Sequence, residues 1–348
     1  MANTNKGTVG ILTGGGDCAG LNAVIRAIVR RADMLGYKVL GIRNGWQGLL
    51  KASAEPLTWP LVCGILPRGG TILGTSRTNP LRKDEDKKAL LSNLTNMGID
   101  FLIAVGGEDT LGVARQLAKE NLRVIGIPKT IDNDVDGTDQ TFGFETAVSI
   151  VTEAIDRLRT TAESHQRVMV LEVMGRHTGW IAIQSGIAGG ADCILIPEKP
   201  MSMEEIAETI KKRHGRGLPF SIVVVAEGFT LKGAEEWVTK DQKVDQFGHV
   251  LLGGIGEIVA KGIEKMTGFE TRVTVLGHVQ RGGSPTAYDR LLGTRYGVRA
   301  MDLIEEGKFG HMVCLHGQEI TSIPLGEAMT RLKYVGEEWI RTAEIFFG

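Results

Sequence analysis

Two short loops of the sequence carry side chains that could perform chemistry. The first, residues 106–110 (GGEDT), follows the apolar run 101–105, which is typical of a strand buried on both faces of a parallel sheet. Its two glycines allow a ligand close to the backbone, and a helix predicted to begin near Thr110 directs free N–H groups to the same point. The loop is therefore predicted to bind an anion.

The second loop, residues 128–134 (PKTIDND), follows the apolar run 124–127 and combines a cation, a hydroxyl and carboxylates. Asp132 and Asp134 are two residues apart, so they face the same side if the chain is extended there. Carboxylates beside an anion site would repel the anion, so their presence there needs an explanation. A divalent metal held by Glu108, with Asp132 as the base that takes a proton from an attacking hydroxyl, supplies that explanation.

Each loop taken alone has a simpler interpretation. A glycine-rich connection can be only a turn, and Asp and Asn favour loops and helix caps without any function. Two such loops after successive strands are a stronger indication, because open α/β sheets bind ligands at the carboxyl ends of their strands. Together they indicate phosphoryl transfer, and the sequence offers no obvious activated Ser or Cys nucleophile for another mechanism.

Two further glycine-rich segments also indicate phosphate binding. Residues 14–17 (GGGD) begin a dinucleotide pattern, G-x-G-x-x-A, that would suit a dehydrogenase. The acid that a dehydrogenase needs after its second strand is missing, because Arg43 follows residues 38–42, so a phosphate loop fits better. Residues 68–77 add two arginines suited to bidentate phosphate contacts, although this segment alone could be a hairpin with solvated ends.

The composition of the whole chain limits the function classes. The chain has 348 residues, enough for two lobes, and its 40 basic residues nearly cancel its 41 acidic ones. No net field therefore favours nucleic acid or an anionic membrane. The N-terminal sequence lacks an apolar signal region and no apolar run approaches transmembrane length, so a cytoplasmic protein is expected.

The four cysteines, Cys18, Cys63, Cys193 and Cys314, are far apart and lack paired metal-ligand spacing. Cys63 and Cys193 have apolar neighbours in the sequence. We therefore predict reduced thiols that are mostly buried.

Apolar runs and helical periodicities alternate along the chain, which predicts a doubly wound α/β fold. The expected strands include residues 9–13, 38–42, 168–173 and 193–197. The expected helices include residues 145–163 and 203–213. Polar loops are predicted at residues 174–176, 226–228 and 272–281. The polar stretch 231–248 is predicted to be a surface excursion, for which a hairpin is one possible form.

Several motifs taken together closely resemble those of the phosphofructokinases, in that family's order and spacing, from about Gly10 to the C-terminus. The motifs are GGGD at 14–17, GGEDT at 106–110, TIDND at 130–134, EVMGR at 172–176 and GHVQRGG at 277–283. The resemblance implies two doubly wound, Rossmann-like lobes with the active site in the cleft between them. It places residues 1–143 and 280–330 in a larger phosphoryl-donor lobe, and residues 144–279 and 331–348 in a smaller sugar-phosphate lobe.

The same resemblance implies roles for individual residues. Asp132 matches the base that deprotonates the C1 hydroxyl of fructose 6-phosphate, with Lys129, Thr130 and Asp134 beside it, and Glu108 matches an acid associated with Mg²⁺, normally Asp. The donor-binding positions are Gly15, Gly16, Arg77, Asp109 and Thr110. The sugar-phosphate positions are Thr130, Asp132, Met174, Gly175, Arg176, Glu227, His278 and Arg281. Arg167 and Arg272 match arginines that enter this pocket from a neighbouring subunit, which implies a homodimer or homotetramer with shared active sites.

The donor is predicted to be pyrophosphate. ATP-using members of the family usually carry Gly at the position of Asp109 and commonly Gly at that of Lys129, and the pair here resembles the pyrophosphate-dependent branch. A carboxylate at the first position fills and repels the space that the α-phosphate of a nucleotide needs, whereas Lys129 can bind pyrophosphate. The expected reaction is a reversible, Mg²⁺-dependent phosphorylation of fructose 6-phosphate in glycolysis and gluconeogenesis.

Two other functions remain as alternatives. One is an ATP-dependent 6-phosphofructokinase, since some ATP-using relatives also carry lysine at the position of Lys129. The other, more remote, is a catalytically silent sugar-phosphate sensor. Silent relatives usually lose the base or the metal acid, and both Asp132 and Glu108 are present here.

Overall fold

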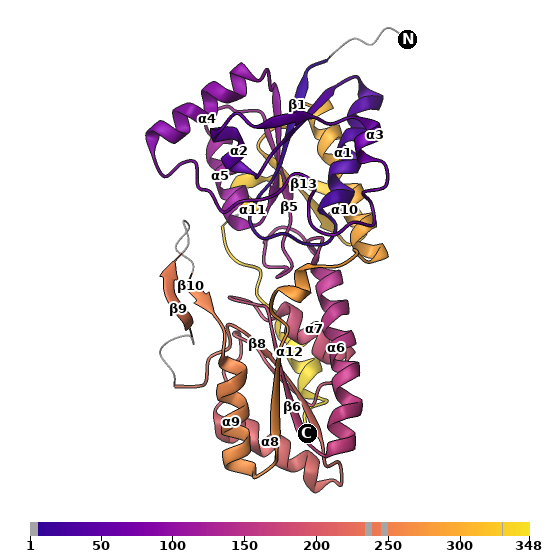
Figure 1. Cartoon of the computed structure of the whole chain (residues 1–348), viewed down its shortest axis with the longest axis vertical. Coiled ribbons are helices and arrows are strands. Elements are labelled where there is room, and N and C mark those ends of the chain that lie inside the picture. The colour runs from indigo at the N-terminus through magenta and orange to yellow at the C-terminus, as the bar shows by residue number, and fades with distance from the viewer. Residues whose placement is uncertain (1–5, 234–238, 245–249, 329) are drawn as a thin grey trace.

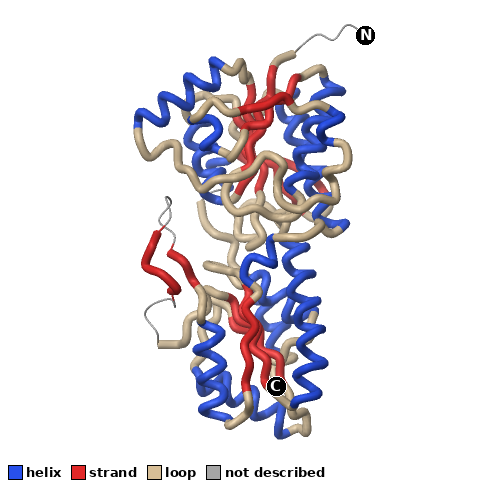
Figure 2. The backbone as a smooth tube through the Cα atoms, viewed as in Figure 1, coloured by secondary structure: helices blue, strands red, loops and turns tan. Residues whose placement is uncertain are grey.

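The computed structural model describes residues 6–233, 239–244, 250–328 and 330–348. Within these residues the chain forms two lobes, each built on its own β-sheet with helices on both faces (Figures 1 and 2). This arrangement confirms the predicted doubly wound α/β class.

The upper lobe in Figure 1 contains a seven-stranded sheet in the order β13-β12-β5-β4-β1-β2-β3. Five central strands are parallel, and the two edge strands β3 and β13 run antiparallel to their neighbours. The strands are β1 (Thr8–Thr13), β2 (Lys38–Ile42), β3 (Ala54–Pro56), β4 (Phe101–Gly106), β5 (Val124–Pro128), β12 (His311–His316) and β13 (Glu319–Pro324).

Both faces of this sheet are buried, which explains the unbroken apolar runs of its strands. On β4, Ile103 belongs to the core shared with one helix layer, and its neighbours Leu102 and Ala104 belong to the core shared with the other. The first layer contains α1 (Leu21–Leu35), α3 (Trp59–Val62) and α10 (Ala287–Glu305). The second contains α2 (Trp46–Leu50), α4 (Asp84–Asn96), α5 (Glu108–Ala118) and α11 (Leu325–Ala328).

The lower lobe contains a four-stranded parallel sheet in the order β11-β6-β8-β7. Its strands are β6 (Val168–Val173), β7 (Cys193–Leu195), β8 (Ser221–Ala226) and β11 (Thr271–Val275). Figure 1 shows α6 (Phe144–His165), α7 (Trp180–Ala188) and α12 (Glu337–Glu344) on one side, and α8 (Met203–Gly215) and α9 (Ile255–Thr267) on the other. Alternate residues of β6 again serve the two faces, because Val170 packs with the α8/α9 core and Leu171 with the α6/α7 core.

Most predicted elements are confirmed, and one predicted loop is wrong. Residues 272–281 are not a continuous polar loop, because they contain most of β11 and the 3₁₀ helix η1 (Gly277–Arg281). β11 lies at the edge of the sheet, where polar Arg272 and Thr274 alternate with valines, so it lacks the unbroken apolar run of the central strands. An antiparallel strand pair is present, but it extends past the predicted stretch 231–248, because β9 (Thr239–Val244) pairs with β10 (Val250–Leu252). Residues 234–238 and 245–249 lie outside the described residues.

All four cysteines are free, and three of them are buried, as expected. The apolar surroundings predicted for Cys63 are wrong, because this residue is exposed at the end of the short helix α3. Among the residues described, no helix is both long and apolar enough to span a membrane. The predicted lobe boundaries near residues 143, 280 and 330 stay a prediction.

Candidate active site

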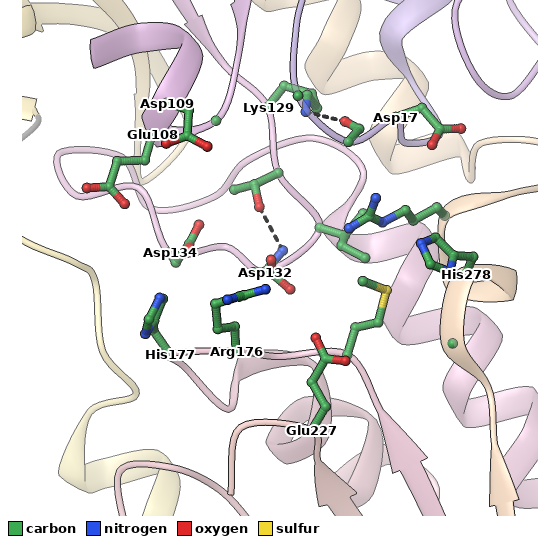
Figure 3. A pocket seen from close by; sticks show the side chains of 18 of the residues that line it. Asp17, Glu108, Asp109, Lys129, Asp132, Asp134, Arg176, His177, Glu227 and His278 are labelled. Atoms are coloured by element: carbon green, nitrogen blue, oxygen red, sulfur yellow. Dashed lines mark hydrogen bonds between the residues drawn. The ribbon is translucent and has the colours of Figure 1, made fainter. Parts of the chain in front are cut away.

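A cavity of about 330 Å³ lies where loops from the two sheets meet (Figure 3). Its walls are the segments that follow β1, β4 and β5 in one lobe and β6, β8 and β11 in the other. Every one of these strands therefore presents its carboxyl end to the cavity, which is the edge where open parallel sheets bind ligands. Of the predicted site residues, all line the cavity except Arg167, Gly175 and Arg272.

The glycine loops after β1 and β4 lie together because Thr110 fills the space between them. Thr110 is buried, and a Cβ added at Gly14 would lie 2.5 Å from its Oγ1. The helix that was predicted to start near Thr110 begins two residues earlier, at Glu108. Glu108 and Asp109 thus occupy the first turn of α5, where the helix dipole favours negative charge.

Lys129 places a cation against the loop after β1. Its side chain is only 3% exposed, and Nζ donates a hydrogen bond to the carbonyl oxygen of Gly16. Burial lowers the pKa of Lys129, while the nearby charges of Asp17 and Asp132 act in the opposite direction. The backbone N–H of Lys129 donates to Gly106 O at 3.0 Å, so this lysine touches both glycine loops.

Asp132 and Asp134 both line the cavity, and the residue between them has a left-handed backbone. Asn133 has φ 52°, a conformation that Asn tolerates better than most residues, so the loop is not a regular extended strand. Its side chain is buried and accepts the backbone N–H of Thr141 at 3.1 Å. This turn leaves the two carboxylates on the cavity side (Figure 3).

The Asp132 carboxyl has the environment of a general base. Its Oδ1 is buried and has no hydrogen-bond partner among the described residues. Burial raises its pKa, and the positive charges of Arg281, Lys129 and Arg176 oppose that shift. Burial, followed by the charge of Asp132, raises the pKa of Asp134 to about 7. Such perturbed carboxyls in a cavity are typical of catalytic sites.

The opposite wall combines cations, a thioether and one acid, contributed by Met174, Arg176, Glu227, His278 and Arg281. Two hydrogen bonds join the loops after β6 and β8: Glu227 N donates to Val173 O at 2.8 Å, and Gly228 N donates to Gly175 O at 3.0 Å. Burial, and next the charge of Asp132, raise the pKa of Glu227 to about 7. The wall suits an anionic, hydroxyl-rich ligand.

The three predicted residues that do not line the cavity occupy two different positions. Gly175 lies in the loop after β6 with a φ of 137°, which favours glycine, and a Cβ there would lie 2.7 Å from the carbonyl oxygen of Thr178. Arg167 and Arg272 lie at the amino ends of β6 and β11, the strand ends remote from the cavity. There both form ion pairs with Glu270, at 2.8 Å for Arg167 Nε.

Sequence reasoning missed several cavity residues with polar side chains, namely Asp17, Glu172 and His177. Each lies within or next to a motif that was interpreted through other positions. Glu172 also has a structural role, because its carboxylate accepts the backbone N–H of Gly256 at 2.8 Å at the start of α9.

Glu108 is the predicted metal ligand. The described residues contain no group of three or more His, Cys, Asp or Glu side chains arranged to hold a metal ion. Mg²⁺ does not need such a group, since it often binds one or two carboxylates together with substrate phosphates and water. Glu108 fits this pattern, because it is an oxygen ligand that lines the cavity beside the glycine loop.

Known proteins are similar in sequence to this chain over almost its whole length. The family model described as Phosphofructokinase matches residues 8–304. A relative from Streptomyces coelicolor named pyrophosphate–fructose 6-phosphate 1-phosphotransferase is 55% identical over 342 residues, covering 98% of this chain and 99% of that protein. A relative from Chloroflexus aurantiacus named ATP-dependent 6-phosphofructokinase is 52% identical over 341 residues, covering 95% of this chain and 94% of that protein.

Solved phosphofructokinase structures have the same fold as this chain. The structure of phosphofructokinase from Saccharomyces cerevisiae matches with a TM-score of 0.82 and 33% identity over 93% of this chain. This chain spans 45% of that longer yeast chain.

Proposed function

The chain belongs to the phosphofructokinase family of phosphotransferases, and we propose that it phosphorylates fructose 6-phosphate with pyrophosphate as the donor. The observation that carries the choice of donor is the position of Asp109. Its side chain lines the cavity in the first turn of α5, beside the glycine loop. Relatives of nearly equal identity are named for either donor, so overall similarity does not decide between them.

The donor argument rests on space and charge. A nucleotide needs room for an α-phosphate beyond the two phosphates that it shares with pyrophosphate. The Asp109 carboxylate fills part of the end of the cavity that Gly15, Gly16 and Gly107 line, and it repels an additional anion there. Pyrophosphate is shorter and can use Lys129, whose cation is held against Gly16, to offset the charge on the departing phosphate.

The proposed reaction needs one base and several positioning groups. Asp132 accepts the proton of the C1 hydroxyl while that oxygen forms a bond to one phosphorus of pyrophosphate, and the bridging P–O bond breaks to release the other phosphate. Thr130 lies beside Asp132 in the cavity. Glu108 would hold Mg²⁺ together with phosphate oxygens and water, and the ion when bound neutralises phosphate charge. Arg77, which lines the cavity, would bind the donor phosphates. The reverse reaction uses the same groups, and we propose that with pyrophosphate the reaction lies near equilibrium and is readily reversible.

Binding of the sugar phosphate uses the opposite wall. Arg176, Arg281 and His278 supply donors for the phosphate and hydroxyls, and Glu227 accepts from a hydroxyl. We propose that Arg167 and Arg272 serve the cavity of a second copy, because they lie too far from their own, so the active form is a homodimer or homotetramer. We place the enzyme in the cytoplasm, in glycolysis and gluconeogenesis.

The test is an assay of fructose 6-phosphate phosphorylation with pyrophosphate and with ATP side by side, at saturating Mg²⁺. We expect turnover with pyrophosphate and little with ATP. A preference for ATP would overturn the donor assignment and leave the sugar site intact. Tight binding of fructose 6-phosphate without turnover on either donor would instead indicate a silent sensor.

A further inference from the structure

The segment of residues 330–336, between α11 and α12, connects the two lobes beside the catalytic loop, which comprises residues 129–143 between β5 and α6. It leaves the upper lobe and descends to α12 on the lower one (Figure 1). On the way it forms an isolated antiparallel bridge between Leu332 and Val135, and the backbone N–H of Lys333 donates to Asp134 O at 2.9 Å. This segment therefore binds directly to the backbone of the loop that carries the reacting carboxylates.

The ammonium group of Lys333 has three acceptors, all in the catalytic loop. Nζ lies 2.9 Å from Asn133 Oδ1, 3.1 Å from Thr138 O and 2.8 Å from Asp139 O. An ammonium has three N–H donors, so this set uses its full capacity. Asn133 is the residue with a left-handed backbone between Asp132 and Asp134. Its Oδ1 accepts hydrogen bonds from Lys333 Nζ and from the backbone N–H of Thr141.

The same residue is anchored to the lower lobe. The indole Nε1 of Trp180 donates to Lys333 O at 2.7 Å, and Nζ lies 5.3 Å from the centre of the Trp180 ring. Two residues further on, Val335 N donates to Glu198 Oε1 at 3.0 Å, and Glu198 also accepts the N–H of Gly179 at the start of α7. Lys333 thus joins the catalytic loop to the lobe that carries the opposite cavity wall.

The charge of Lys333 suits this position. Burial lowers its pKa to about 8, and the charges of Asp139, Asp134 and Asp136 oppose that shift, so the ammonium form predominates at neutral pH. Asp136 also forms an ion pair with Arg331 at 2.8 Å on the same segment. Arg331 is largely exposed, and its partner in this ion pair, Asp136, is not one of the proposed catalytic carboxylates. Substitution of Arg331 therefore offers a matched control for substitution of Lys333.

We propose that Lys333 is a positioning residue for phosphoryl transfer, which holds the left-handed turn at Asn133 and so keeps Asp132 and Asp134 directed into the cavity. This inference rests on the proposed function, because it concerns the geometry of the proposed base. Lys333 itself does not line the cavity, and its hydrogen bonds in this loop go to backbone carbonyls and to Asn133 Oδ1, not to a carboxylate of Asp132 or Asp134. Its loss should therefore affect the chemical step more than the binding of substrate.

The experiment compares Lys333→Met with Arg331→Met in the full-length protein. For Lys333→Met we expect kcat to fall by about 10- to 100-fold, with KM for fructose 6-phosphate within about threefold of the wild type, because small displacements of a reacting group have effects of this size. Hydrogen exchange of residues 130–141, followed by mass spectrometry, should become faster. Arg331→Met should leave kcat and KM unchanged, and it should speed exchange in residues 130–141 less than Lys333→Met does, because it removes only the exposed ion pair with Asp136.

Further outcomes keep the test decisive. Unchanged kcat and unchanged exchange in Lys333→Met would overturn the proposal, as would an equal loss of kcat in Arg331→Met. If Lys333→Met does not fold, Lys333→Arg replaces it, since a guanidinium keeps the charge but spreads its donors over a planar fork and cannot direct three of them from a single nitrogen to the three acceptors. We then expect an intermediate kcat with a Tm close to the wild type, and full activity would overturn the proposal. If the wild type has no phosphofructokinase activity, the proposed function fails while hydrogen exchange still tests the role of Lys333.

Discussion

Gly16 and Arg281 both line the cavity and lie so close together that a side chain on Gly16 would collide with the arginine. A Cβ added at Gly16 would lie 2.5 Å from Nη1 and 2.9 Å from Cζ of the arginine. Gly16 belongs to the loop after β1 of the seven-stranded sheet, and Arg281 ends the 3₁₀ helix after β11 of the four-stranded sheet, so the contact joins segments that follow strands of the two different sheets. The donor loop and the proposed sugar-phosphate wall therefore meet at one point.

This contact predicts the effect of a single added methyl group. Gly16→Ala should leave the fold intact, because only the flexible end of Arg281 must move to make room. The displaced guanidinium should then bind the sugar phosphate less well, and we expect KM for fructose 6-phosphate to rise about 10-fold. Steady-state kinetics and a thermal melt of the same preparation measure both effects.

Gly112→Ala is the control. Gly112 lies within α5, and a Cβ there would meet nothing within 4 Å. Alanine should raise the free energy of unfolding by up to about 1 kcal/mol through helix propensity, without changing KM. If Gly16→Ala behaves like this control, Arg281 does not hold the sugar phosphate.

Asp132→Asn tests the proposed base. An amide keeps the shape of the side chain but cannot take a proton, so turnover should fall by about 10²-fold or more with a modest effect on sugar binding. Calorimetric titration of the variant with fructose 6-phosphate separates binding from chemistry. Near-normal turnover in this variant would remove Asp132 from the role.

The pH dependence of kcat should reflect the burial of this carboxyl. The base works only when ionised, and burial raises the pKa of Asp132 while Arg281, Lys129 and Arg176 lower it. Activity should therefore be lost as pH falls, with a midpoint above about 4, the ordinary value for Asp. In Arg281→Gln one of the opposing charges is gone, so the midpoint should move to higher pH. A profile of this variant that coincides with the wild type, measured at saturating sugar, would contradict the electrostatic account.

Asp109→Gly tests the choice of donor. Removing the carboxylate opens the glycine-lined end and removes a negative charge, so we expect activity with ATP to rise about 10-fold or more relative to pyrophosphate. Turnover with each donor at saturating Mg²⁺ measures the ratio. An unchanged ratio would show that something other than Asp109 excludes the nucleotide.

The sequence alone was enough to predict the elements and the edge of the sheet that carries the site. The runs at 101–105 and 124–127 are apolar because β4 and β5 are covered on both faces, and that signal is local. The loops that follow them, with Asp132 and Asp134, then had to lie at the strand carboxyl ends. Family membership was equally accessible, since its motifs are short and contiguous.

Contacts between distant segments were decided only by the tertiary structure. Lys333 binds Asn133 from 200 residues away, and nothing in the local pattern of either residue indicates the other. Arg281 reaches Gly16 through the 3₁₀ helix that follows the edge strand β11. The sequence pattern predicted a loop there and gave no indication of this contact. Periodicity reports which face of an element is buried, whereas the partner on that face depends on how the two sheets pack.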